Sequence, residues 1–123
     1  MNGNKLLADT NILLYFLKGN PEVIEMLNNK EIVVSFITEL ELLCFPEITD
    51  HSDKIIRGLL KNCSVIELNP EIKELAIEFR RKSRLKLPDS IIAATAFYLQ
   101  LPLITADHHF RKVEALNLIF YDV

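Results

Sequence analysis

The stretch Lys5-Leu6-Leu7-Ala8-Asp9-Thr10-Asn11 joins a short apolar run to three polar residues. The apolar part suits a strand that is buried on both faces, and the polar part suits the point where such a strand ends. In open sheets of parallel strands, ligands bind beyond the carboxyl ends of the strands. The stretch therefore predicts both a buried parallel strand and a functional edge at Asp9.

The rest of the chain repeats this alternation of short apolar runs with segments of helical period. Strands are expected at residues 5–8, 32–35, 65–68, 103–105 and 118–121. Helices are expected at residues 12–17, 21–29, 38–45, 51–60, 70–83, 89–99 and 108–115. Such an order predicts an α/β fold, an open sandwich of helices around a mainly parallel sheet.

The composition favours one domain spanning residues 1–123, because half of the 123 residues are apolar and the chain is too short for two ordinary domains. The formal net charge of -3 gives no global electrostatic attraction to nucleic acid, so any RNA binding must be local or assisted by a metal. The three glycines are scattered, and no glycine-rich loop could cradle a nucleotide phosphate. This argues against an ATP- or NAD-binding domain.

Cys44 and Cys63 lie among apolar residues and form no CxxC pair, which favours buried free thiols over a disulfide or a zinc site. A reducing cytoplasm fits this usage. Asp9 interrupts the first apolar run before it could serve as a signal peptide. The longest apolar stretch, residues 91–104, is broken by Gln100 and Pro102 and is too short to span a bilayer. We expect a soluble protein that has no membrane partner.

Four acids occupy positions that such a fold would bring toward one crevice. Asp9 ends the first strand, Glu41 lies one turn into the helix after the second, Asp89 opens a nearly all-apolar helix, and Asp107 follows the strand at 103–105. Taken singly, each could be a helix cap, and Thr38 and Glu41 have the spacing of a capping box. Ser, Thr or Asn would cap a helix equally well, yet all four positions carry carboxylates. Taken together, the four acids therefore favour a functional site.

Like charges gathered within a few ångströms are unfavourable unless a cation compensates them. Oxygen ligands without accompanying histidines or cysteines suit Mg²⁺ or Mn²⁺ rather than structural zinc. Such a metal can polarise a phosphate oxygen and activate a water for attack. The chemistry expected from the four acids is phosphodiester hydrolysis.

The sequence resembles the PIN-domain proteins of the VapC type, the toxin half of bacterial and archaeal toxin–antitoxin pairs. The resemblance covers essentially the whole chain. Its motifs, in order, are Leu7-Ala8-Asp9-Thr10-Asn11, Ser35-x-Ile37-Thr38-x-x-Glu41-Leu42, Leu87-Pro88-Asp89-Ser90-Ile91-Ile92-Ala93-Ala94-Thr95-Ala96, and Leu103-Ile104-Thr105-Ala106-Asp107 with Phe110. Any one is weak, but the ordered set is specific.

The resemblance implies a PIN-like three-layer α/β/α sandwich and a Mg²⁺- or Mn²⁺-dependent endoribonuclease. It also implies a homodimer and an antitoxin whose tail covers the acidic groove. The family's metal-binding and catalytic acids fall on Asp9, Glu41, Asp89 and Asp107, with Asn11 and Thr105 as supporting polar groups. Glu41 is thereby chosen over Glu39, which points to another face of the same helix. One departure is Cys44-Phe45-Pro46, where a small residue often follows the Glu-Leu element.

Basic residues gather just upstream of Asp89, five of them in the seven positions 80–86. Most suit the end of the helix expected at 70–83, where cations complement the helix dipole. Arg84 and Lys86 are singled out as weaker candidates for contacts with RNA phosphates. His108 and His109 are interpreted as solvated residues at a helix start and are left out of the catalytic set.

Two alternatives stay open on the residues alone. Haloacid-dehalogenase-like phosphatases also place an aspartate after the first strand, but they require a second aspartate two positions on, where this chain has Asn11. A non-catalytic domain that binds RNA or a partner is the other alternative, and its expected mark is the loss of one or more acids. The sequence retains all four.

Overall fold

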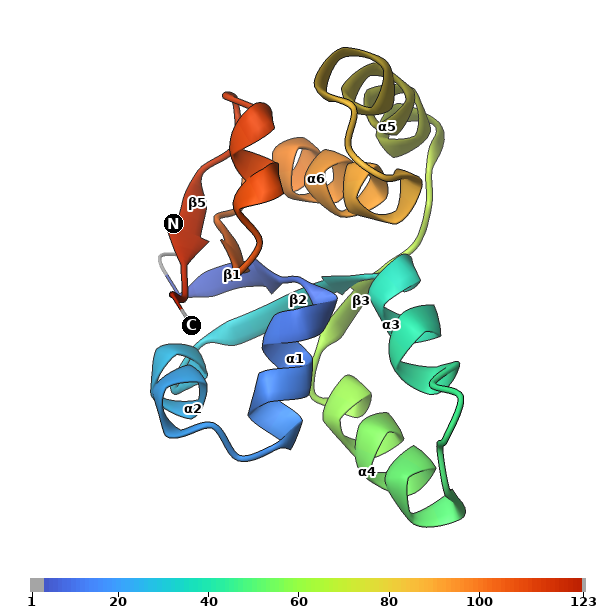
Figure 1. Cartoon of the computed structure of the whole chain (residues 1–123), viewed down its shortest axis with the longest axis vertical. Coiled ribbons are helices and arrows are strands. Elements are labelled where there is room, and N and C mark those ends of the chain that lie inside the picture. Colours follow the sequence, from blue (N-terminus) through green and yellow to red (C-terminus); the bar gives the residue numbers. More distant parts are fainter. Residues whose placement is uncertain (1–3, 123) are drawn as a thin grey trace.

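The computed structural model of the chain describes residues 4–122. Its centre is a five-stranded sheet in the order β3-β2-β1-β4-β5, and every neighbouring pair of strands is parallel (Figure 1). The predicted parallel sheet is confirmed, with strand ends that differ by no more than two residues. The strands are β1 (Lys5–Ala8), β2 (Glu31–Ser35), β3 (Ser64–Ile66), β4 (Leu103–Thr105) and β5 (Leu118–Phe120).

Helices cover both faces of this sheet, so the molecule has the predicted three layers (Figure 1). One layer holds α5 and α6, and the other holds α1, α2 and α4, while α3 lies beside the end of β2. The helices are α1 (Thr10–Leu17), α2 (Pro21–Leu27), α3 (Phe36–Leu43), α4 (Asp50–Lys61), α5 (Pro70–Ser83), α6 (Leu87–Leu99) and the 3₁₀ helix η1 (His108–Lys112).

Alternation along the strands divides the core into two halves. Leu7 of β1 and Leu103 of β4 pack with α5 and α6, whereas Leu6 of β1 and Ile104 of β4 pack with α1, α2 and α4. Successive side chains of a strand point to opposite faces, and here both faces are covered, so the strands are mostly apolar, with polar residues at their ends. The sheet is packed between the two layers of helices.

Two sequence interpretations near the site are wrong. The proposed capping box of Thr38 and Glu41 does not form, because α3 starts earlier and Ser35 caps it by accepting a hydrogen bond from the Ile37 N–H. The helix expected at 108–115 is the five-residue 3₁₀ helix η1. Phe110 and Val113 are both buried, and a spacing of three places them on one side of a tight 3₁₀ turn.

The prediction of two buried thiols is also wrong for Cys44, which is exposed, while Cys63 is partly buried and both are free. The reason is the early end of α3 at Leu43, which leaves Cys44 outside the helix as its C-cap. Burial raises the pKa of the Cys63 thiol. Within residues 4–122, none of the helices combines the length and the apolarity needed to cross a membrane.

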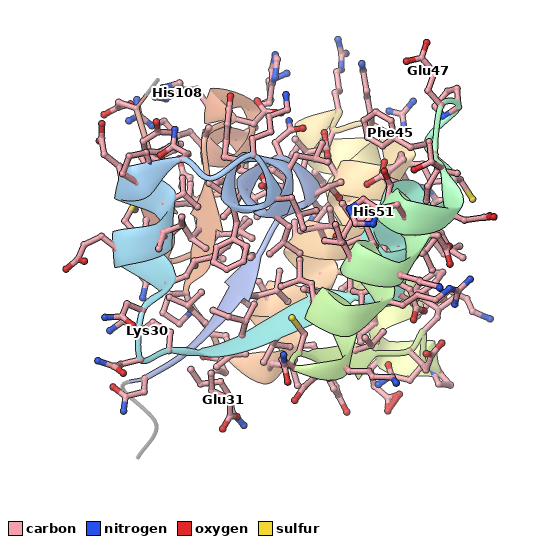
Figure 2. All side chains as sticks on the ribbon, turned by 90° about the horizontal axis from the view of Figure 1, so that it is seen from below. Lys30, Glu31, Phe45, Glu47, His51 and His108 are labelled. Carbon is pink, nitrogen blue, oxygen red and sulfur yellow. The ribbon has the colours of Figure 1, made fainter. Side chains whose placement is uncertain are left out.

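The two ends of the sheet differ in what lies over them. In Figure 2, Lys30 and Glu31 lie at one end, where β2 begins, and His108, Phe45 and Glu47 lie at the opposite end. The second end is the carboxyl end of the strands, where the connections to α1, α3 and η1 leave the sheet. The candidate site residues follow the strands at this end.

Candidate active site

The strand order places three of the four predicted acids side by side. β2, β1 and β4 are neighbours in the sheet. Asp9 follows β1 directly, Asp107 comes two residues after β4, and Glu41 lies in α3, which starts directly after β2. Asp89 reaches the same edge from the first turn of α6. Parallel strands with these connections bring residues far apart in sequence to one place.

One cavity of about 300 Å³ receives all four carboxylates. Asn11 also lines it, whereas Glu39 does not, in agreement with the choice of Glu41. Within residues 4–122, no three histidine, cysteine, aspartate or glutamate side chains converge tightly enough to form a ready-made ion cage. The four acids thus line one hollow together. The lining residues are Asp9, Thr10, Asn11, Leu14, Glu41, Phe45, Asp89, Ile92 and Asp107.

Asp9 is the most buried of the acids, with only 4% of its surface exposed. Its Oδ1 accepts a hydrogen bond from the Ile12 N–H at 3.0 Å, and its Oδ2 accepts one from the Thr105 hydroxyl. Burial raises the pKa of Asp9 to about 6, the two hydrogen bonds oppose this rise, and the negative charges of Asp89 and Asp107 add to it. Asp9 therefore holds its proton more tightly than an ordinary aspartate does.

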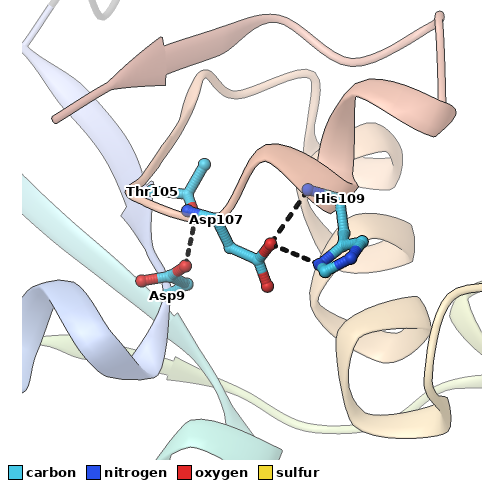
Figure 3. A network of polar contacts seen from close by, with 4 residues as sticks. All are labelled: Asp9, Thr105, Asp107 and His109. Atoms are coloured by element: carbon cyan, nitrogen blue, oxygen red, sulfur yellow. Dashed lines mark hydrogen bonds and ion pairs between the residues drawn. The ribbon is translucent and has the colours of Figure 1, made fainter. Parts of the chain in front are cut away.

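Asp107 belongs to a polar network that Figure 3 shows from close by. Its N–H donates to the Thr105 Oγ1 at 2.9 Å, and its Oδ1 lies 2.8 Å from the His109 Nδ1. The same Oδ1 accepts from the His109 N–H at 2.9 Å. Thr105 thus connects Asp9 to Asp107, and His109 fixes the direction of the Asp107 carboxylate. The sequence analysis interprets His109 as solvated, and its side chain is 70% exposed, but the contact with Asp107 was not predicted.

Glu41 lies on the exposed surface of α3 but is held by a threonine from α1. The Thr10 hydroxyl donates to the Glu41 Oε1 at 2.6 Å, and the same Oγ1 lies 3.1 Å from the Thr38 Oγ1. Thr38 is fully buried, so this contact links the start of α1 to the interior side of α3. Thr10 and Thr38 were not predicted as site residues, although both lie in the motifs that carry the family resemblance.

Asp89 responds electrostatically to the other acids. Its own burial raises its pKa, and the negative charges of Asp107 and Glu41 raise it further. Lys86 and His109 oppose the rise. The charges of Asp107 and Glu41 therefore act on Asp89 in the cavity that all three residues line.

The interpretation of the acids as helix caps holds for two of the four. Asp9 caps α1, and Asp107 caps η1. Glu41 lies within α3 and away from its N-terminus, so it caps no helix. Asp89 lies in the first turn of α6, but no side chain makes a cap hydrogen bond at the start of that helix. Capping therefore does not explain why Glu41 and Asp89 face the same cavity as the two caps.

A second hollow of about 340 Å³ adjoins the acidic cavity. Asp89 and Asp107 line both, so they form the wall between them. The two predicted phosphate-contact residues, Arg84 and Lys86, lie in this second hollow. Lys112 lies there as well, and sequence reasoning missed it because only the fold brings η1 beside the end of α5. The lining residues are Arg84, Leu85, Lys86, Asp89, Asp107, His109 and Lys112.

Comparisons with known proteins agree with this architecture. The sequence profile of the PIN domain matches residues 6–116. Ribonuclease VapC2 of Methanocaldococcus jannaschii is 31% identical over 142 residues, which cover 97% of this chain and 95% of that protein. A chain of a toxin-antitoxin complex from Klebsiella pneumoniae superposes with a TM-score of 0.84 at 30% identity and covers 96% of this chain and 99% of its own length.

A chain of the VapBC-1 structure from nontypeable Haemophilus influenzae superposes with a TM-score of 0.81 at 26% identity, over 94% of this chain and 97% of that one. The agreement therefore extends over the whole fold, including the strands and helices that carry the four acids. With the profile match over residues 6–116 and the 31% identical relative, the family is established. The chain belongs to the PIN-domain family.

Proposed function

We propose that this protein is a Mg²⁺- or Mn²⁺-dependent endoribonuclease and acts as the toxin of a toxin–antitoxin pair. The observation that supports this most is the cavity at the carboxyl end of the sheet, which four carboxylates line together. The similarity to a protein named a ribonuclease supports RNA as the substrate class. Asp9, Glu41, Asp89 and Asp107 are the proposed catalytic acids and metal ligands, and Asn11 and Thr105 are the proposed supporting residues.

The chemistry of the lining residues fits a hard divalent cation. The donors available in the cavity are oxygens, and neither cysteine nor histidine lines it. Burial raises the pKa of Asp9 and that of Asp89, and the negative charges of neighbouring acids add to both rises, so a bound cation would stabilise the two carboxylates. When bound, a divalent cation polarises a phosphate oxygen and lowers the pKa of a water that attacks phosphorus.

The chain's own residues orient the acids for this task. The Thr105 hydroxyl holds Asp9, and the two donors of His109 hold Asp107. Thr10 holds Glu41 on the side of α3 that faces the cavity. Ligands fixed by such hydrogen bonds need little rearrangement during the reaction, and partners of this kind are typically worth 10- to 100-fold in metal affinity or activity.

The phosphatase alternative is the weaker one. Asn11 lines the cavity two residues after Asp9, and an amide cannot donate the proton that a phosphatase of that class requires from an aspartate there. The alternative of a non-catalytic binding domain gives no reason for four like charges around one hollow, three of them buried or half-buried. The ribonuclease, the phosphatase and the non-catalytic domain predict different reaction products, so one assay separates them.

The assay incubates purified protein with a structured RNA that has single-stranded loops, in Mg²⁺, in Mn²⁺ and in EDTA. We expect cleavage that requires the metal and that is lost in Asp9→Asn and Asp89→Asn, because each removes one ligand and keeps the side-chain size. Glu39→Gln is the control, since Glu39 does not line the cavity. Hydrolysis of p-nitrophenyl phosphate without RNA cleavage would favour the phosphatase, and RNA binding without any cleavage would favour the binding domain.

The proposed protein partner is an antitoxin that inhibits the nuclease. An apolar groove of about 370 Å³ lies between α1, the segment after α3, and α4, and it shares Leu14 and Phe45 with the acidic cavity. Such a groove suits an amphipathic helix whose extension would reach the acids. The similarity to chains of toxin-antitoxin complexes supports this partner. A variant that lacks the four acids tests this arrangement. If it binds the antitoxin as tightly as wild type does, the antitoxin does not insert among the acids.

We further propose a homodimer in the cytoplasm. Several large apolar side chains on the helices are exposed, among them Ile24 of α2 and Leu40 of α3, and an apolar surface of this kind favours association. The cytoplasm is where an RNA-cleaving toxin meets its substrate. Light scattering at micromolar concentration measures the mass, and a monomer there would contradict the dimer.

A further inference from the structure

The hollow beside the acidic cavity differs sharply from it in charge. We call it the basic cleft and define it by Arg84, Lys86 and Lys112, which line it together with Asp89 and Asp107. The cleft has three permanent cations against two carboxylates, whereas the acidic cavity has four carboxylates and no lysine or arginine. Because Asp89 and Asp107 line both hollows, the change from a mainly acidic to a mainly basic lining occurs at these two residues.

The fold builds the cleft from two segments that are distant in sequence. Leu85 is 2% exposed and anchors the connection after α5, so Arg84 and Lys86 on either side of it are exposed. Phe110 is 1% exposed and anchors η1, which leaves Lys112 at the surface.

A hydrogen bond from the Ser83 hydroxyl to the Lys112 carbonyl, 3.2 Å long, ties the two segments together. The end of α5 and the end of η1 are therefore fixed relative to each other. The cations of the cleft stand on anchored backbone and not on independent loops.

Local structural roles explain these cations only in part. Arg84 lies at the C-terminus of α5, where a cation complements the helix dipole, but Lys86 is the N-cap of α6, where the dipole disfavours a cation. Within residues 4–122, neither Arg84, Lys86 nor Lys112 takes part in an ion pair, although Lys5, Arg57 and Lys82 do. What sets these three cations apart is that they line one cleft together, where their charges can meet an external anion.

We propose that the basic cleft binds the RNA phosphate that neighbours the scissile phosphate. This inference rests on the proposed ribonuclease function, which puts the scissile phosphate in the acidic cavity. Adjacent phosphates of one strand then lie on either side of the wall formed by Asp89 and Asp107, and the chain of the substrate crosses that wall. Arg84 offers a planar fork of donors to the phosphate oxygens, and Lys112 offers a point charge from the opposite segment.

The experiment measures how two changes combine. The cleavage position in a short RNA is first mapped with wild-type protein in Mn²⁺. The same RNA is then made with an uncharged methylphosphonate in place of the phosphate on the 5′ side, or on the 3′ side, of the cleaved bond. kcat/KM is measured for wild type, Arg84→Gln and Lys112→Gln on all three RNAs. Arg81→Gln is the matched control, because Arg81 is in α5 but lines a different hollow.

For wild type, one of the two methylphosphonates should lower kcat/KM by about tenfold or more, as expected for the loss of a charge-assisted hydrogen bond. Arg84→Gln and Lys112→Gln should show a similar loss on unmodified RNA and little further loss on that methylphosphonate RNA. The salt slope of RNA binding should also fall by about 0.7 in each variant, the value for one single-strand phosphate contact. Arg81→Gln should retain the full discrimination of wild type.

If the variants remain as sensitive to the methylphosphonate as wild type, the two losses of kcat/KM are independent. That result would overturn the cleft proposal and leave the proposed ribonuclease function standing. Equal loss in Arg81→Gln would mean that only the general charge of the surface matters, and this too would overturn it. If the wild type cleaves no RNA in Mn²⁺, the proposed function itself fails. Thermal melts of the variants exclude misfolding as the cause of a loss, because all three substituted side chains are exposed.

Discussion

The Thr105 hydroxyl donates a hydrogen bond to the Asp9 carboxylate, and this bond joins two residues that are 96 positions apart in the chain. The same hydroxyl oxygen accepts a hydrogen bond from the Asp107 N–H at 2.9 Å. Thr105 ends β4 and Asp9 follows β1, and these two strands are neighbours in the sheet. One buried hydroxyl group therefore sets the positions of two of the four acids.

Thr105→Val should reduce RNA cleavage strongly and destabilise the protein by about 1–3 kcal/mol, because valine keeps the shape but leaves the Asp107 N–H and the Asp9 carboxylate without their partner. Urea unfolding and a cleavage assay measure the two effects. Thr95→Val is the matched control, since the buried Thr95 hydroxyl donates only to the Ile91 carbonyl inside α6. Normal cleavage by Thr105→Val would show that the hydroxyl does not position the acids.

The stability of the metal-free protein should depend on Asp9 in a defined pH window. The pKa of Asp9 rises from its ordinary value of 3.8 to about 6 on folding. The folded protein therefore binds more protons than the unfolded chain between these values, and the contribution of Asp9 to stability falls as the pH rises through them. A shift of this size corresponds to about 3 kcal/mol.

Asp9→Asn removes this charge and keeps an acceptor for the Ile12 N–H, while its amide nitrogen replaces the oxygen that accepts from the Thr105 hydroxyl. In EDTA at fixed ionic strength, we expect the variant to exceed wild type in unfolding free energy at pH 7 by about 1–3 kcal/mol, with the advantage shrinking toward pH 4. Denaturant titrations at several pH values give the difference directly. An advantage that is constant over this range would mean that the Asp9 carboxyl is not perturbed.

Much of this site could be predicted from sequence because it depends on local patterns. The strand ends, Asp9 and Asp107 follow from apolar runs that stop near an acid, and Asp89 follows from the apolar helix that it opens. The connection from Glu41 to Thr10 could not be predicted, since a contact between α1 and α3 depends on how the helices pack. The start of α3 was misplaced because Ser35 and Thr38 are both good caps, and the end of β2 at Ser35 decides between them.

The basic cleft, too, could be predicted from the sequence only in part. Arg84 and Lys86 are adjacent to Asp89 in sequence and could be suggested, although a helix terminus explained them equally well. Lys112 comes from η1, and its place opposite Arg84 depends on the bond between Ser83 and the Lys112 carbonyl. A sequence pattern reports periodicity along one segment, whereas this cleft is a property of two segments and the core that holds them.

Glu41 and Glu39 offer a clean comparison of two acids on one helix. Glu41 lines the acidic cavity and Glu39 does not. Glu41→Gln should lower metal-dependent cleavage by about 10- to 100-fold, the range seen when a metal site loses one supporting group, and Glu39→Gln should leave it near wild type. Both variants keep the helix and the side-chain length. An inactive Glu39→Gln beside an active Glu41→Gln would mean that the other face of α3 serves the reaction.

The most direct test of the central claim, that the four carboxylates bind a catalytic cation, is the effect of Mn²⁺ on thermal unfolding at constant ionic strength. A cation that binds only the folded state stabilises it by about 2.7 kcal/mol at a hundredfold excess over Kd. We expect Mn²⁺ to raise the Tm of wild type clearly, and Asp89→Asn to melt higher than wild type in EDTA and to gain much less from Mn²⁺. If wild type and Asp89→Asn respond identically to Mn²⁺, Asp89 is not a ligand and the acidic cavity is not the metal site.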